Sequence, residues 1–377
     1  MGINMKYRGK IVDSHHHMVG GYGEGLGFYE SYEKMLEMGK LSAMNVVMIP
    51  QWCEEYITQN QQAILLKSLY PGKYFSYAGF DYYLPQGKKQ REIELQARQY
   101  IDMGFDGIKM VELKPMVYKQ LGCPVLSSDQ YEGMWSFMEE CQAPVLLHMG
   151  DPETYWDINR VTQMALDRGW FCGNGDFPPL EDFYADVERV LDRHPQLNVS
   201  LAHYYFLSDQ IERAAKMLDK HPYVRFDLTP GREMYENFSK RPDEWRDFFI
   251  EYQDRILYGT DNGWGGSQDA QEKYELAKLN AFVQHRFLQT ADCFEGYGFQ
   301  VRGIDLPQKV LEKIYYKNFE EMAGSTPKDM DPKKGLAYVE EMIDVYKDSN
   351  VPYYEKEMEL MEFIRDQLKI FIVQEKL

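Results

Sequence analysis

Several histidines stand at the ends of short apolar segments, where side chains that bind a metal ion would be expected. His15 and His17 close the segment Ile11–His17, and alternation along a strand would point both side chains to one face. Asp13 would share that face one layer deeper, whereas His16 would point toward the surrounding helices. Two imidazoles on one face are well placed to chelate a divalent ion, although a pair of core histidines would give the same pattern.

Three later segments carry the same signal. His148 follows Val145-Leu146-Leu147, His203 follows Leu201-Ala202, and Asp261 ends an apolar run that begins at Ile256. A single histidine after a strand is more often structural. Five such residues at the ends of four strands make separate structural roles a poor joint explanation, and a shared site is predicted.

The elements that must position these residues recur along the chain as eight short runs of apolar, β-branched or aromatic residues, most followed by a helical pattern. The predicted strands are Ile11–His17, Met44–Pro50, Tyr74–Asp81, Gly107–Leu113, Pro144–Gly150, Asn198–Tyr204, Val224–Pro230 and Ile256–Asn262. The predicted helices include Tyr29–Leu41, Glu92–Met103, Tyr131–Cys141, Glu181–Arg193 and Gln210–Asp219. Alternating strands and helices imply a parallel sheet, and eight units predict an α/β fold of the (β/α)8 TIM barrel class, regular or distorted, over residues 1–324.

Two connections are longer than usual, Asp151–Pro179 and the glycine-rich Gly263–Gln271. Long loops at the carboxyl ends of barrel strands often build substrate pockets. Residues 325–377 differ in pattern and carry two amphipathic helices, Lys334–Lys347 and Tyr354–Gln374, the second with a broad apolar face. We expect them to form a helical extension that packs on the barrel or at the subunit interface of a homo-oligomer.

Composition restricts the partners. The 377 residues carry a formal net charge of -18 at pH 7, which argues against nucleic acids and anionic membranes as partners, because both need a basic footprint. Five cysteines without a C-x-x-C pair argue against a disulfide framework and a cysteine zinc site, and favour a reducing cytoplasm. No signal peptide and no run of ~18 apolar residues is visible, so neither secretion nor a membrane span is expected.

Taken jointly, these motifs resemble the amidohydrolase superfamily, and most closely its branch of aminocarboxymuconate-semialdehyde decarboxylase and related aromatic-acid decarboxylases and hydrolases. The likeness runs from Ile11 to about Gly324. The motifs that carry it are Asp13-x-His15-x-His17, His148, His203, the Gly259-Thr260-Asp261 turn, Leu306-Pro307 and Ile314–Asn318.

The resemblance implies a metal site and an acid/base residue. The implied ligands of one divalent ion are His15, His17, His148 and Asp261. His203 is implied to be a catalytic acid/base or a further ligand. Three imidazoles and a carboxylate suit Zn²⁺, and the same set would accept Mn²⁺, Fe²⁺ or Co²⁺.

Lys109, in the fourth predicted strand, has three open interpretations. Some binuclear relatives carry a carboxylated lysine on this strand that bridges two ions, in which case His148 and His203 would hold the second ion. The ammonium could instead bind a substrate carboxylate. It could also point outward and pair with Glu112 or Asp106.

The predicted partner is a small-molecule substrate. Its candidate binding residues are Lys109, Trp156, Arg232, Asn262 and Trp264. The first expectation is hydrolysis of a small amide, ester or lactone, with Asp261 and His203 as acid/base groups. The alternative is decarboxylation of a small aromatic carboxylic acid, and the third possibility is a barrel that binds a ligand without catalysis.

Overall fold

The computed structural model describes residues 6–49, 57–82, 91–264, 270–347 and 354–374. Its main sheet holds nine parallel strands in the spatial order β8-β7-β6-β5-β4-β3-β2-β1-β9. In sequence order the strands are β1 Val12–Met18, β2 Ala43–Val47, β3 Tyr74–Ala78, β4 Gly107–Leu113, β5 Val145–Met149, β6 Val199–Leu201, β7 Val224–Asp227, β8 Ile256–Leu257 and β9 Asn262–Trp264. Strands β2 to β8 are buried throughout, as their nearly continuous apolar runs predict for a sheet covered on both faces.

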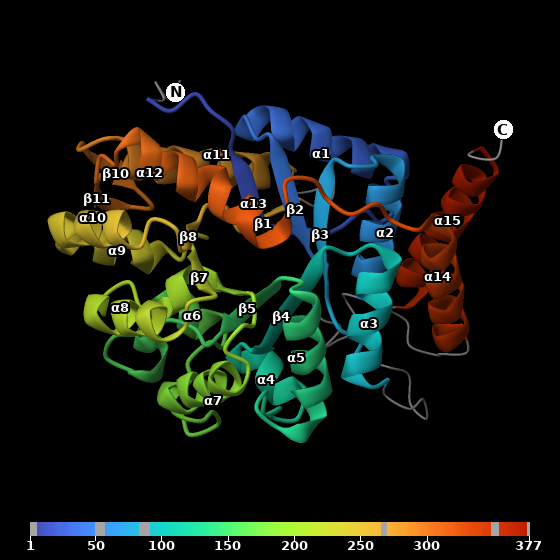
Figure 1. Cartoon of the computed structure of the whole chain (residues 1–377), viewed down its shortest axis with the longest axis horizontal. Helices are drawn as coiled ribbons and strands as arrows, with labels where there is room; N and C mark the ends of the chain where they lie inside the picture. Colours follow the sequence, from blue (N-terminus) through green and yellow to red (C-terminus); the bar gives the residue numbers. More distant parts are fainter. Residues whose placement is uncertain (1–5, 50–56, 83–90, 265–269, 348–353, 375–377) are drawn as a thin grey trace.

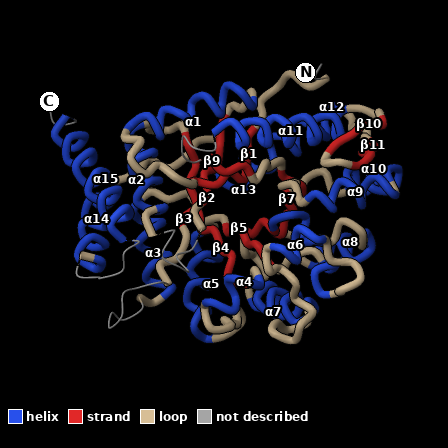
Figure 2. Tube along the Cα trace, turned by 180° about the vertical axis from the view of Figure 1, so that it is seen from behind, coloured by secondary structure: helices blue, strands red, loops and turns tan. Residues whose placement is uncertain are grey.

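Strands β8 and β9 are two pieces of one segment, and together they close the sheet. β8 pairs with β7, whereas β9 pairs with β1. Between the two pieces, the backbone N–H of Ser14 donates to the carbonyl of Tyr258 at 3.0 Å. The eight predicted strands are therefore present, and the predicted TIM-barrel-like architecture is confirmed (Figure 2).

Helices surround this sheet (Figure 1). Their bounds are α1 Leu26–Gly39, α2 Gln59–Leu69, α3 Ile93–Met103, α4 Pro115–Gln120, α5 Asp129–Cys141, α6 Gln163–Asp167, α7 Leu180–Arg193, α8 Ile211–Lys220, α9 Arg232–Lys240, α10 Pro242–Glu251, α11 Ala270–Gln289, α12 Gln308–Glu312, α13 Asn318–Ala323, α14 Pro332–Tyr346 and α15 Tyr354–Gln374. A hairpin, β10 Cys293–Gly296 and β11 Phe299–Arg302, separates α11 from α12. None of the helices in the described ranges is long and apolar enough to cross a membrane.

A bulge in β1 changes which side chains share a face. Asp13 pairs with Met44 and His16 with Val46, so β1 has one more residue than β2 across this stretch. The extra residue reverses the alternation of side chains. Asp13 therefore lies on the same side as His16, with its Oδ2 3.4 Å from His16 Nδ1. The expectation that Asp13 shares a face with His15 is wrong for this reason.

The two carboxyl-terminal helices pack against each other and against α2 (Figure 1). Met361, Ile364 and Leu368 of α15 are fully buried in this contact. The apolar face is not covered to its end, because Ile370 in the last turns is 50% exposed. The described chain thus covers the middle of the predicted apolar face and leaves its end open.

Ile364 and Ile370 of α15 form a matched pair for measuring this packing. Ile364→Ala should lower the free energy of unfolding by about 2–5 kcal/mol, because it leaves a cavity at a fully buried position. Ile370→Ala, the control, should change it by about 0.5 kcal/mol or less. Chemical denaturation measures both values. Equal effects would show that α15 does not pack on the barrel as described.

Candidate metal centre and active site

Three of the four predicted ligands converge at the carboxyl ends of the strands. His15 Nε2 and His17 Nε2 lie 3.2 Å apart. Asp261 Oδ1 lies 3.1 Å from His17 Nε2 and 3.5 Å from His15 Nε2. A tetrahedral ion with bonds of ~2.0–2.2 Å needs ligand atoms ~3.3–3.6 Å apart, so this spacing fits one divalent ion.

Asp227 fixes the protonation of the first ligand. Its Oδ2 lies 2.9 Å from His15 Nδ1, which must donate its proton to the carboxylate. The lone pair of a neutral His15 is then on Nε2, the atom that faces His17 and Asp261. Burial, together with the charge of Lys109, lowers the pKa of His15 to about 4, which keeps the ring neutral. This carboxylate–histidine pair is the arrangement that orients metal-binding histidines, so the residues present fit the implied ion.

Asp261 reaches the cluster from a left-handed backbone, with φ 54°. A non-glycine residue pays for this conformation and needs support from its surroundings. Asp13 supplies part of it, because Thr260 donates to Asp13 from its backbone N–H at 3.0 Å and from its hydroxyl at 2.6 Å. The backbone N–H of Asp261 also donates to the carbonyl of His15 at 2.9 Å. The bulge that moves Asp13 off the ligand face thus lets it hold the turn that carries Asp261.

His148 adjoins the cluster through His203. The Nδ1 atom of His148 lies 3.1 Å from Nε2 of His203, and its Nε2 lies 3.0 Å from the carbonyl of Gly150. Within the described residues, the group whose donor atoms all lie close together contains only His15, His17 and Asp261. His148 therefore stays a predicted fourth ligand, placed beside the candidate acid/base His203.

A left-handed turn presents His203 to the site. The sixth predicted strand ends early, at Leu201, and His203, Tyr204, Tyr205 and Phe206 all have φ values between 53° and 55°. Such residues normally avoid this region, so burial must compensate for the strain.

Two tyrosines of this turn supply that burial. Tyr204 is enclosed by aromatic rings that include Phe226 and Trp245, and Tyr205 packs against Tyr184. The backbone N–H of His203 donates to Asp227 Oδ1 at 2.8 Å. The same carboxylate therefore contacts a predicted metal ligand, His15, and the acid/base candidate, His203.

Lys109 is fully buried, and its Nζ lies 3.0 Å from His15 Nε2. Asp106 pairs with Lys67 instead, and Glu112 accepts from Tyr82 at 2.8 Å. The interpretation that Lys109 points outward is therefore wrong. Burial lowers the pKa of Lys109 to about 8. The ammonium beside the ligand cluster therefore loses its proton more readily than it would in water.

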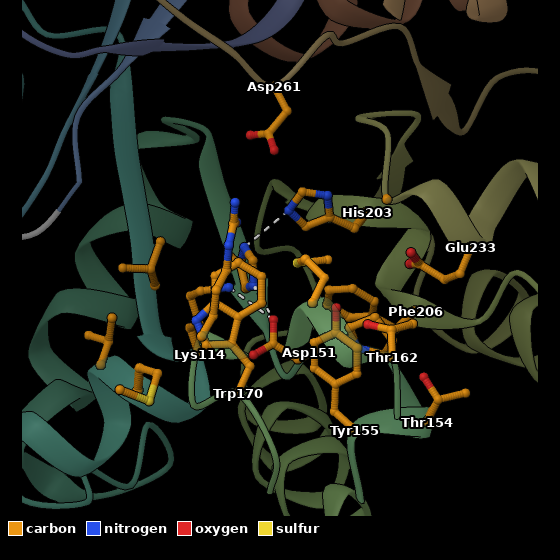
Figure 3. Close-up of a pocket in the computed structure, with 18 of the residues that line it drawn as sticks. Lys114, Asp151, Thr154, Tyr155, Thr162, Trp170, His203, Phe206, Glu233 and Asp261 are labelled. Carbon is orange, nitrogen blue, oxygen red and sulfur yellow. Dashed lines mark hydrogen bonds and ion pairs between the residues drawn. The ribbon is translucent and has the colours of Figure 1, made fainter. Parts of the chain in front are cut away.

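A cavity of about 900 Å³ opens in front of the cluster (Figure 3). His17, His148, His203 and Asp261 line its floor. Its walls are largely apolar and aromatic, and the side chains that form them include Met116, Val117, Tyr155, Trp170, Phe206, Tyr297 and Phe299. Such a volume suits a small organic substrate. The long loop after β5 contributes Tyr155 and Trp170, as expected of a pocket-building loop.

The proposed substrate-binding residues are distributed unevenly. Trp156 donates its indole N–H to the carbonyl of Pro178 at 2.9 Å and is absent from the described cavity lining. Asn262 accepts from Asn280 at 2.9 Å and lines a second cavity behind β1. The side chains of Arg232 and Trp264 lie outside the described part of the structure.

Asp227, which contacts His15, and Lys114 and Glu233, which line the cavity, were not singled out from the sequence. Asp227 follows Val224-Arg225-Phe226, where an arginine interrupts the apolar residues, so the signal that identified His148 is weaker here. Lys114 and Asp151 form an ion pair at 2.9 Å, and Lys114 also lies over Trp170. Glu233 lines the wall near Phe206 (Figure 3). These last residues lie in loops or at helix starts, where no periodic pattern reveals which side chains meet.

Comparisons with known proteins agree with this geometry. Among solved structures, a putative amidohydrolase from Staphylococcus aureus is 15% identical with a TM-score of 0.53, over 84% of this chain and 100% of that one. IDCase from Metarhizium anisopliae, in apo form, is 13% identical with a TM-score of 0.50, over 83% and 97% of the two chains. At these identities the likeness shows the fold alone. No curated protein matches.

A family model described as amidohydrolase matches residues 48–322. The match begins after His15 and His17, so the assignment of that pair rests on the motif and on the geometry of the cluster. It covers the segments that carry His148, His203 and Asp261. Since this match spans well over half of the chain, the protein belongs to the amidohydrolase family, as its motifs predicted.

Proposed function

We propose that the protein is a metal-dependent hydrolase of a small amide, ester or lactone. The observation that carries this proposal is the convergence of His15, His17 and Asp261 on one point at the floor of the cavity. A divalent ion held there, with His148 as a further ligand, would supply a Lewis acid and an activated water near neutral pH.

Asp261 is the base of this proposal. Burial alone would raise the pKa of its carboxyl, but the hydrogen bond from His17 and the neighbouring imidazoles outweigh it and hold the pKa well below its usual range. The group is therefore an ionised carboxylate at neutral pH. Its Oδ1 faces the ligand cluster, so the remaining oxygen lone pairs are available to take a proton from the attacking water.

His203 is the second acid/base group. Its ring packs against those of His148 and Phe206, with ring centres 4.7 and 5.4 Å away, and its Nε2 lies 3.1 Å from His148 Nδ1. Its Nδ1 lies 3.2–3.3 Å from the hydroxyl and carbonyl oxygens of Thr229, so that nitrogen is the protonated one when the ring is neutral. Nε2, which adjoins His148 Nδ1, is then the atom that would exchange a proton with the leaving group of the substrate.

The charge of the cavity disfavours an anionic substrate and so favours hydrolysis over decarboxylation. The charged side chains of its described lining are the cations Lys114 and Arg168 and the anions Asp151, Glu233, Glu236 and Asp261. Lys114 is already paired with Asp151. A carboxylate substrate would therefore meet a surplus of negative charge away from the ion.

Decarboxylation is the second candidate, because one observation favours it. The ammonium of Lys109 lies 3.0 Å from His15 Nε2, so a fixed cation adjoins the ligand cluster and could attract a substrate carboxylate. IDCase of Metarhizium anisopliae and the putative amidohydrolase of Staphylococcus aureus both share this fold, so the architecture permits more than one reaction.

The proposal is tested by screening the zinc- or manganese-loaded protein against amides, esters and lactones alongside aromatic carboxylic acids. Hydrolysis products should form with the neutral substrates and should be lost in Asp261→Asn, because an amide accepts a proton poorly and binds metal weakly. Release of carbon dioxide without hydrolysis would replace the proposal by its second candidate.

His203→Asn should lower kcat by ~10²–10⁴-fold while the protein keeps about one ion per chain, because the residue acts on the substrate rather than on the ion. His194→Asn is the control, since His194 is also buried but bonds Glu139 and is not among the residues that line the cavity. Elemental analysis and kinetics are measured together. If His203→Asn also removes an ion and Lys109→Ala does the same, the centre holds two ions.

Asp227→Asn should weaken metal binding by ~10–100-fold, because an amide cannot hold the proton of His15 Nδ1 as a carboxylate does. Competition with a chromophoric chelator measures the affinity. Asp186→Asn is the matched control. Asp186 of α7 is also buried and hydrogen-bonded, but it accepts from the backbone N–H of Leu126 rather than from a histidine. Unchanged affinity in Asp227→Asn would show that His15 is not an ion ligand.

A further inference from the structure

Glu233 lies in the first turn of α9, directly after the loop that leaves β7, and lines the substrate cavity. Figure 3 shows it on the wall beside Phe206, apart from Asp261, with Lys114 and Trp170 on another side of the cavity. The carboxylate of Glu233 lies close to Gly231. A Cβ built on Gly231 would lie 2.3 Å from Oε1 and 2.8 Å from Oε2, so a larger residue there would displace the carboxylate.

No side chain of the described residues pairs with this carboxylate. The charges that surround it belong to the acids Asp151, Glu236 and Asp209. Burial, together with these like charges, raises the pKa of Glu233 to about 7. Keeping this carboxylate ionised among like charges is unfavourable unless a ligand supplies a cationic or hydrogen-bonding partner.

The cations of the cavity are occupied elsewhere. Lys114 pairs with Asp151 at 2.9 Å, and the guanidinium of Arg168 lies 4.8 Å from the ring centre of Trp170. Neither relieves Glu233. A partner for this carboxylate must therefore enter with the substrate.

We propose that Glu233 recognises an amino or ammonium group at the end of the substrate remote from the ion. This inference rests on the proposed function, because the reacting end must lie at His15, His17 and Asp261. The cavity is also lined by apolar side chains, among them Val117 and Phe206, which suit a ring or short hydrocarbon body. The substrate class is then an amine-bearing small amide, ester or lactone.

The test uses hydroxamic acids, which chelate a divalent ion without being turned over. Three probes are compared by calorimetry on the zinc-loaded protein: benzohydroxamic acid, its 4-ethyl derivative and its 4-aminomethyl derivative. The aminomethyl probe should bind at least about tenfold more tightly than the ethyl probe of similar size, as a charge-assisted hydrogen bond requires. Glu233→Gln should remove this preference. Glu236→Gln, one turn further on the same helix, should keep it.

The outcomes separate this inference from the function on which it rests. Equal affinity of the ethyl and aminomethyl probes in the native protein, or a preference that survives Glu233→Gln, overturns the role of Glu233 and leaves the metal centre intact. If none of the three probes binds the zinc-loaded protein, the proposed hydrolase centre fails, and the assignment of Glu233 fails with it.

Discussion

The carboxylate of Asp227 is the interaction on which the rest of the site depends. One oxygen accepts from His15 Nδ1 and the other from the backbone N–H of His203, and Thr229 also donates to it from its hydroxyl and its backbone. A single buried group therefore joins three neighbouring segments of the barrel. Burial alone would raise the pKa of Asp227, but the contact with His15 outweighs it and lowers the pKa, so the acceptor stays ionised. Without it, His15 would lose the acceptor of its Nδ1 proton, and the turn at His203 would lose a backbone hydrogen bond.

The site combines local strain with a well-packed surrounding core. Four consecutive left-handed residues after β6 and the left-handed Asp261 after β8 are unfavourable conformations. Tyr204 and Tyr205 offset the first by filling aromatic clusters on the outer side of the sheet. Hydrogen bonds to Asp13 and His15 offset the second. The stability of the barrel is thus used to hold side chains where a relaxed chain would not place them.

The sequence predicted the strands and the polar residues at their ends, because short apolar runs that end in polar residues mark both. Eight apolar runs gave the strands, and polar residues at their ends gave His15, His17, His203 and Asp261, because both signals depend only on local alternation and burial. Asp13 was misplaced because a bulge inserts one residue, which no composition signal marks. The left-handed turn at His203 was likewise not predictable, since its four residues include no glycine. Glu233 gains its position from tertiary contacts with loops far away in the chain.

The division of the eighth strand at Asp261 has a consequence for assembly. Its first piece, β8, pairs with β7, and its second piece, β9, pairs with β1. The segment that closes the barrel therefore also carries Asp261, the carboxylate of the His15, His17 and Asp261 cluster. A chain still emerging from the ribosome has His15 and His17 from the start, yet it lacks the seam that joins its two ends. The centre therefore cannot form until nearly the whole domain has been synthesised. Uptake of the proposed ion would in this way be tied to a finished barrel rather than to a partly made one.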